Sequence, residues 1–166
     1  NADLIKKVLV KEYMYSKEDI FLDKHNIGPE YFDTKLKMAI TQSSSFLLLV
    51  TQDCFIPKEK EDWFIEEIKH AIKRAKENEI KIIPILFDDI KNLSDDKIIE
   101  QLKMSFTDNE IDVLTKSEAI RYDFYFSDSA FSKIASFINQ ANSVKHNIIL
   151  VILSYIIAFV AICTIA

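Results

Sequence analysis

The sequence predicts an α/β domain with a doubly wound parallel sheet, followed by one C-terminal transmembrane helix. Three observations predict this fold class. Short apolar runs alternate with stretches of helical periodicity, which is the pattern of βαβ units. The run SFLLLV (45–50) is apolar almost throughout, as expected of a strand in a sheet that is covered on both faces. The last 20 residues, 147–166, contain no charged side chain.

The first third of the chain is expected to form helix, strand, loop, helix and strand. Apolar residues recur at helical spacing in ADLIKKVLVKEYM, and Phe32, Leu36 and Ile40 again share one helix face. Between these segments, DIFLD is a brief strand-like run. The expected elements are a helix at 2–14, a strand at 19–23, a loop at 24–32, a helix at 32–42 and a strand at 45–50.

The alternation continues in the rest of the chain. EDWFIEEIKHA begins a helix that we expect to reach about Lys76, and KIIPILFD is a second buried strand. A polar, mixed region predicts at least one short helix, and Ser127 or Asp128 is the expected N-cap of the last helix. The expected elements are a helix at 61–76, a strand at 81–88, the mixed region at 89–117, a strand at 119–124 and a helix at 127–140. With the first third, this order gives four strands connected by helices.

The composition excludes several classes of function. The formal net charge is −5 and the sequence pI is about 5.3, with acidic and basic residues mixed, which argues against a nucleic-acid surface. Gly28 is the only glycine, so a P-loop or a glycine-rich dinucleotide turn cannot form. The two cysteines and three histidines have no disulfide or metal-ligand spacing. We therefore expect a protein of a reducing compartment with no nucleic-acid partner, no metal and no cofactor.

The C-terminal segment predicts how the domain is attached to a membrane. A helix needs roughly 20 apolar residues to cross a hydrocarbon core of about 30 Å, and 147–166 meets that requirement. The alternative is a buried core helix, which a segment of this length that is apolar on all sides disfavours. Lys145 and His146 flank the segment, so the soluble domain is expected in the cytosol. The predicted organisation is a domain at 1–141, a linker at 142–146 and a single membrane span.

Two adjacent glutamates in EDWFIEEIKHA differ in their expected surroundings. The apolar stripe of this helix comprises Phe64, Ile65, Ile68, Ala71, Ile72 and Ala75. Glu66 points away from that stripe, whereas Glu67 lies at its edge, one turn after Trp63. Because the helix follows a buried strand, this edge is expected near the carboxyl ends of the strands, where parallel sheets bind ligands. Glu67 is therefore either a boundary glutamate favoured by the helix N-terminus or a residue held for chemistry.

The order of these segments resembles a TIR (Toll/interleukin-1 receptor) domain, particularly the bacterial type, over about residues 3–140. FLDKHNIGPEYF is similar to the second strand and BB loop of the family, and AITQSSSF to the end of the following helix. LLLVTQDCF resembles the third strand, with Thr51 and Gln52 where Ser-Pro is usual. DWFIEEIKHA resembles the Trp-Cys-x-x-Glu-Leu segment, with Phe64 and Ile68 at the Cys and Leu positions. The resemblance implies a flavodoxin-like fold.

The resemblance also implies an activity and its residues. NAD-consuming members of the family cleave the nicotinamide–ribose bond with the glutamate four residues after the Trp, which is Glu67 in this chain. A carboxylate can stabilise the oxocarbenium-like transition state of this reaction, and Trp63 could stack on the nicotinamide. Asp23 is a second candidate for substrate binding, although a turn or capping role is favoured. Ile27, Gly28 and Pro29 correspond to the BB loop, which implies assembly with other TIR domains.

Two departures and two alternatives accompany this interpretation. The family opens with a central strand that this chain lacks, so we expect it upstream of Asn1, and Gly28-Pro29 reverses the usual order of these residues. The expected function is a membrane-anchored NAD+ glycohydrolase activated by self-association in defence or signalling. The first alternative is a non-catalytic TIR scaffold. The second is a receiver-like domain, for which Asp88 and Asp89 are suitably placed but the remaining acidic and lysine residues are absent.

Overall fold

The domain is built on a parallel β-sheet. The computed structural model describes residues 2–21, 29–57, 62–87, 90–122 and 127–142. Within them, the strands β1 (Ser45–Val50), β2 (Lys81–Leu86) and β3 (Ile120–Arg121) form a three-stranded parallel sheet in the order β1-β2-β3. Ser45 is opposite Lys81, and Ile85 is opposite Ile120. The chain is therefore α/β with parallel strands, as the alternation of elements predicts.

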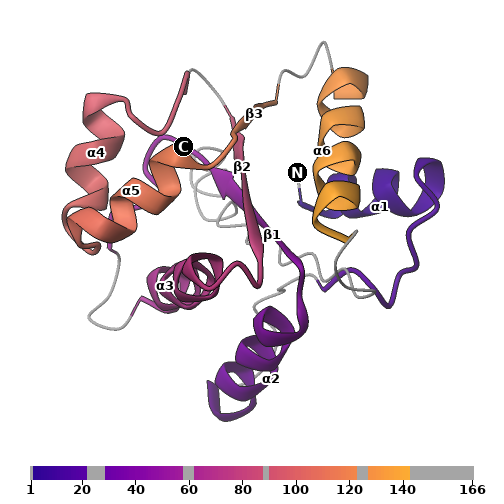
Figure 1. Cartoon of the computed structure of the whole chain (residues 1–166), viewed down its shortest axis with the longest axis horizontal. Helices are drawn as coiled ribbons and strands as arrows, with labels where there is room; N and C mark the ends of the chain where they lie inside the picture. Colours follow the sequence, from indigo (N-terminus) through magenta and orange to yellow (C-terminus); the bar gives the residue numbers. More distant parts are fainter. Residues whose placement is uncertain (1, 22–28, 58–61, 88–89, 123–126, 143–166) are drawn as a thin grey trace, which may run out of the picture.

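Helices cover both faces of this sheet (Figure 1). Helices α1 and α6 lie on one side, whereas α3, α4 and α5 lie on the other, and α2 packs beside α3. Covering both faces explains why β1 is buried along its whole length. The helices of the described residues are α1 (Ala2–Glu12), α2 (Pro29–Gln42), α3 (Trp63–Lys76), α4 (Asp96–Leu102), α5 (Asp108–Lys116) and α6 (Ser127–Asn142).

Two hydrophobic cores fill the space on either side of the sheet. Alternate residues of β1 point to opposite faces because the side-chain period of a strand is two. Phe46 and Leu48 pack with α2, α3, α4 and α5, whereas Leu47 and Leu49 pack with α1 and α6. The sheet therefore separates two cores, one that contains the buried residues of α3 and one that contains those of α1 and α6.

Several sequence predictions are confirmed with shifted boundaries. The strand 45–50 and the end of α3 at Lys76 agree with the prediction. Helix α1 ends two residues earlier than expected. Helix α2 begins at Pro29 and not at residue 32, because proline is favoured in the first turn of a helix, where its missing N–H would have no partner within the helix. The mixed region contains two helices, α4 and α5. The start of α5 was not expected, although Thr107 and Glu110 are a recognisable capping pair.

Two predictions are wrong within the described residues. No strand forms at Asp19–Phe21, because the amides of Asp19 and Ile20 bond to a turn and Lys6 Nζ donates to the Ile20 carbonyl. Ile20 is nevertheless buried, so it contributes to the core from a turn. The described sheet thus has three strands and not four. Ser127 and Asp128 lie inside the first turn of α6 and not before it.

The predicted membrane span lies outside the described residues, as does the linker beyond Asn142. Within the part of the chain that the structure describes, no helix combines the length and apolar character that crossing a bilayer requires.

Candidate functional site

Helix α3 carries the two residues that the sequence singles out most clearly. Its start is set by Asp62, whose backbone is extended and whose Oδ1 accepts a hydrogen bond from the Phe64 amide at 3.1 Å. Trp63 is the first helical residue, and 41% of its surface is exposed. Basic residues occupy the last turn, where they complement the negative end of the helix dipole. Local capping thus places Trp63 at the amino end of α3, after the carboxyl end of β1.

The adjacent glutamates have different surroundings, as helical geometry predicts. The side chain of Glu66 is 59% exposed and accepts a hydrogen bond from Lys69 Nζ at 3.0 Å. Glu67 is only 5% exposed. The exposed ion pair between Glu66 and Lys69 stabilises the fold by less than about 1 kcal/mol. A buried carboxylate is uncommon and occurs most often where a protein uses it or pairs it, so Glu67 is the candidate of the two.

The edge of α3 that carries Glu67 faces α2. Trp63, Glu67, His70 and Arg74 follow one another at spacings of three and four residues, so they form a single stripe along the helix. His70 Nε2 lies 3.3 Å from the Thr41 hydroxyl oxygen. The Arg74 guanidinium donates to the carbonyl of Ser43, which directly follows α2, at 3.1 Å. Glu67 therefore lies on the side of α3 that packs against α2 and not on its solvent face.

Several cationic side chains lie where α2 packs against α3, and they lower the pKa of His70. Burial lowers the pKa of His70 below its ordinary value, and the charges of Arg74, Lys37 and Lys73 lower it further. All of these effects disfavour the imidazolium form. His70 is therefore neutral near pH 7, and it lies three residues after Glu67 on the same stripe of α3.

The loop between β1 and α3 is anchored in the core by an aromatic side chain. Phe55 is fully buried, with ring centroids 6.2 Å from Phe64 and 6.3 Å from Phe106, the latter in an edge-to-face arrangement. Gln101 on α4 donates from Nε2 to the Gln52 carbonyl at 2.8 Å. These contacts hold the first part of the loop that leads to Trp63. Sequence reasoning missed them because periodicity within one element carries no information about a loop inserted between helices.

Other predicted site residues are not brought together with Glu67. Asp23, Ile27 and Gly28 lie outside the described residues, and Pro29 is the first residue of α2. Sequence reasoning also missed Arg74, which reads as one of several basic residues in the last turn of a helix. No cluster of metal-ligating side chains occurs among the residues that the structure describes.

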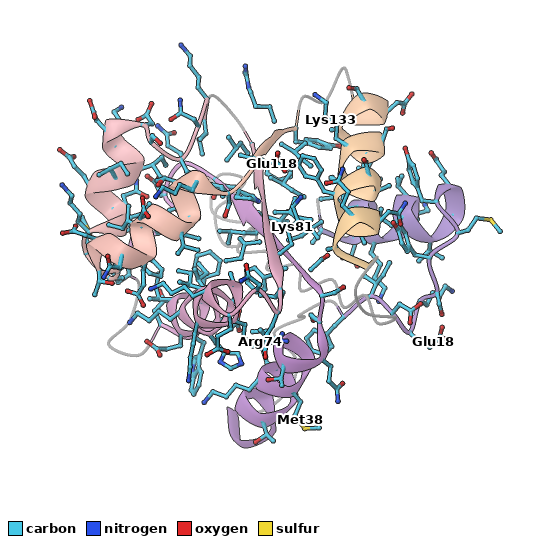
Figure 2. All side chains as sticks on the ribbon, viewed as in Figure 1. Glu18, Met38, Arg74, Lys81, Glu118 and Lys133 are labelled. Atoms are coloured by element: carbon cyan, nitrogen blue, oxygen red, sulfur yellow. The ribbon has the colours of Figure 1, made fainter. Side chains whose placement is uncertain are left out.

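A cavity of about 290 Å³ lies at the opposite edge of the sheet from the start of α3. Lys76, the last residue of α3, is nine residues beyond Glu67, about 14 Å along the helix axis, and the cavity begins after it, so the cavity is separate from the glutamate. Lys81 is part of it and pairs with Glu118 at 3.2 Å near the start of β2 (Figure 2). The lining residues are Ser44, Asn78, Glu79, Ile80, Lys81, Gln140 and Ala141.

Comparison of the sequence with known protein families found no match, and searches of curated proteins and of solved structures found no related chain.

Proposed function

We propose that this chain is a membrane-anchored NAD+ glycohydrolase with a flavodoxin-like fold of the TIR type. The observation that carries the proposal is the placement of buried Glu67 and exposed Trp63 on one edge at the start of α3. Glu67 is 5% exposed and Trp63 is 41% exposed, one helical turn apart. The loop before them leaves the carboxyl end of β1, and ligands of parallel α/β sheets bind at that edge. A shielded carboxylate beside an accessible indole suits a flat, cationic nicotinamide ring.

The proposed reaction breaks the bond between the nicotinamide nitrogen and the ribose C1′. The nitrogen takes the bonding electron pair, which turns the cationic ring into neutral nicotinamide, and positive charge develops on the ribose as an oxocarbenium ion. The Glu67 carboxylate stabilises that charge and accepts hydrogen bonds from the ribose hydroxyls. Water then forms a bond to C1′ and releases a proton, which yields ADP-ribose. Attack by an adenine nitrogen in place of water yields a cyclic product. No metal or cofactor takes part.

The proposal includes where the enzyme acts and what activates it. Residues 147–166 anchor the chain in a membrane as a single span, with the catalytic domain on the cytoplasmic side. Other copies of the same domain are the proposed partners, through Ile27, Gly28 and Pro29, which the sequence resemblance assigns to the BB loop. Anchoring confines copies to a surface, which raises their effective concentration and favours self-association. Activity in a defence or signalling response follows from such clustering.

One observation favours a second function, that of a non-catalytic scaffold for TIR assembly. With 5% of its surface exposed, Glu67 offers little area to a substrate in this arrangement of α2 and α3. A glutamate with a purely structural role would have the same burial. In the scaffold, the domain associates with its own kind at the membrane and leaves NAD+ unchanged.

The two functions are separated by measuring NAD+ consumption by the full chain in lipid vesicles at increasing surface density. We expect turnover that rises with density. Glu67→Ala is expected to lower it by at least about 100-fold, the magnitude typical of removing a group that stabilises transition-state charge. Glu66→Ala is the matched control, because Glu66 is the exposed neighbour on the same turn, and it should stay within about twofold of the wild type.

Equal losses of NAD+ turnover in Glu67→Ala and Glu66→Ala would refute the assignment of Glu67 as the catalytic residue. Self-association without turnover at any density would establish the scaffold in place of the enzyme. Circular dichroism of both variants controls for unfolding.

A further inference from the structure

Arg74 is a buried cation on the same edge of α3 as Glu67. Its side chain is 7% exposed, and it follows Glu67 by two helical turns. Arginine is rarely buried to this extent unless its charge and its donors are engaged. Arg74 is labelled in Figure 2, where it lies between α3 and α2.

The guanidinium of Arg74 holds the carboxyl end of α2. One terminal nitrogen donates to the carbonyls of Ile40 and Ser43, the second at 3.1 Å. The Ile40 carbonyl is among the last four of α2, at the negative end of the helix dipole, and it also accepts a hydrogen bond from the Ser43 amide at 3.2 Å. Nε donates to Glu79 Oε2 at 3.1 Å, beyond the end of α3. One side chain thus joins the end of α2 to α3 and to the turn before β2.

We propose that Arg74 is a positioning residue for Glu67, because it fixes the edge of α3 that carries this glutamate against α2. The inference rests on the proposed function for its kinetic consequence only. Two carbonyls and one carboxylate from different segments are bound by one planar guanidinium. A lysine ammonium cannot reproduce this fork. Retaining the charge without the fork should therefore loosen α2 from α3 and displace the Glu67 edge.

The test compares Arg74→Lys with a control that is matched for stability, both in the full chain. The control is Ile134→Val or Ile134→Ala, whichever has the thermal midpoint of Arg74→Lys. Ile134 is fully buried in the core on the other face of the sheet. For NAD+ cleavage we expect Arg74→Lys to lower kcat by about tenfold or more with KM within about twofold. The matched control should keep kcat within about twofold of the wild type. A near-attack geometry that is lost by small displacements accounts for this difference.

Amide hydrogen exchange supplies a readout that does not depend on activity. In Arg74→Lys, the amides at 66–70 and 40–43 should exchange at least about tenfold faster than in the matched control. Exchange rates equal to those of the control overturn the proposal, whether or not the wild type cleaves NAD+. Equal losses of kcat in Arg74→Lys and in the control also overturn it, because they reduce Arg74 to a contributor to stability. Faster exchange in Arg74→Lys, together with no NAD+ cleavage by the wild type, refutes the glycohydrolase but supports the role of Arg74 in holding α2 against α3.

Discussion

Replacing Phe55 by alanine tests whether the loop between β1 and α3 is anchored as the structure describes. Phe55 is fully buried between Phe64 and Phe106. Transferring a phenylalanine side chain out of water contributes up to about 3 kcal/mol, and the cavity left by truncation adds to the loss. Core Phe→Ala substitutions accordingly cost about 3–5 kcal/mol. We expect about 4 kcal/mol, a large part of the 5–15 kcal/mol typical of a domain.

The measurement is urea denaturation followed by far-UV circular dichroism. With a slope of about 2 kcal/mol per molar urea, a loss of about 4 kcal/mol lowers the midpoint by about 2 M. The matched control is Ile56→Ala, the next residue of the same loop, because Ile56 is 39% exposed and should lose less than about 1 kcal/mol. A loss below about 1 kcal/mol in Phe55→Ala, or equal losses in the two variants, would refute the placement of this ring between α3 and α4–α5.

Two further predictions concern pH. Burial, followed by the charges of Arg74, Lys37 and Lys73, lowers the pKa of His70. The unfolded state therefore binds more protons, and the stability of the protein falls as the pH drops below about 6.5. The thermal midpoint of His70→Gln should fall less over that pH range than that of the wild type, and an unchanged profile would contradict the lowered pKa. Burial raises the pKa of Glu110, but the hydrogen bonds from the Thr107 amide and hydroxyl outweigh it and lower the pKa overall. Glu110→Ala should therefore cost about 1 kcal/mol at pH 7, a difference that shrinks as the pH falls below about 4.5, and a pH-independent difference would count against the capping role.

The elements predicted from the sequence were those whose evidence is local. The strand 45–50 and helix α3 were predicted within about two residues because alternation, apolar runs and helical stripes depend on neighbours a few positions apart. The separation of Glu66 from Glu67 was predicted for the same reason. The strand expected at 19–23 does not form at 19–21, because a strand needs a partner edge and an apolar run alone cannot supply one.

The sequence by itself determined the parallel α/β architecture of the described residues and which of two glutamates lies at the edge of the core. Only the tertiary structure decided which side chains hold that edge in place. Arg74 contacts carbonyls 34 and 31 residues earlier in the chain, and Phe55 meets Phe106 in the connection between α4 and α5. Such contacts have no periodic signature, since they form only when elements distant in sequence pack together. The position of Glu67 at the edge of the core can thus be predicted from the eleven residues EDWFIEEIKHA, whereas the contacts of Arg74 that hold this edge against α2 can be found only in the folded structure.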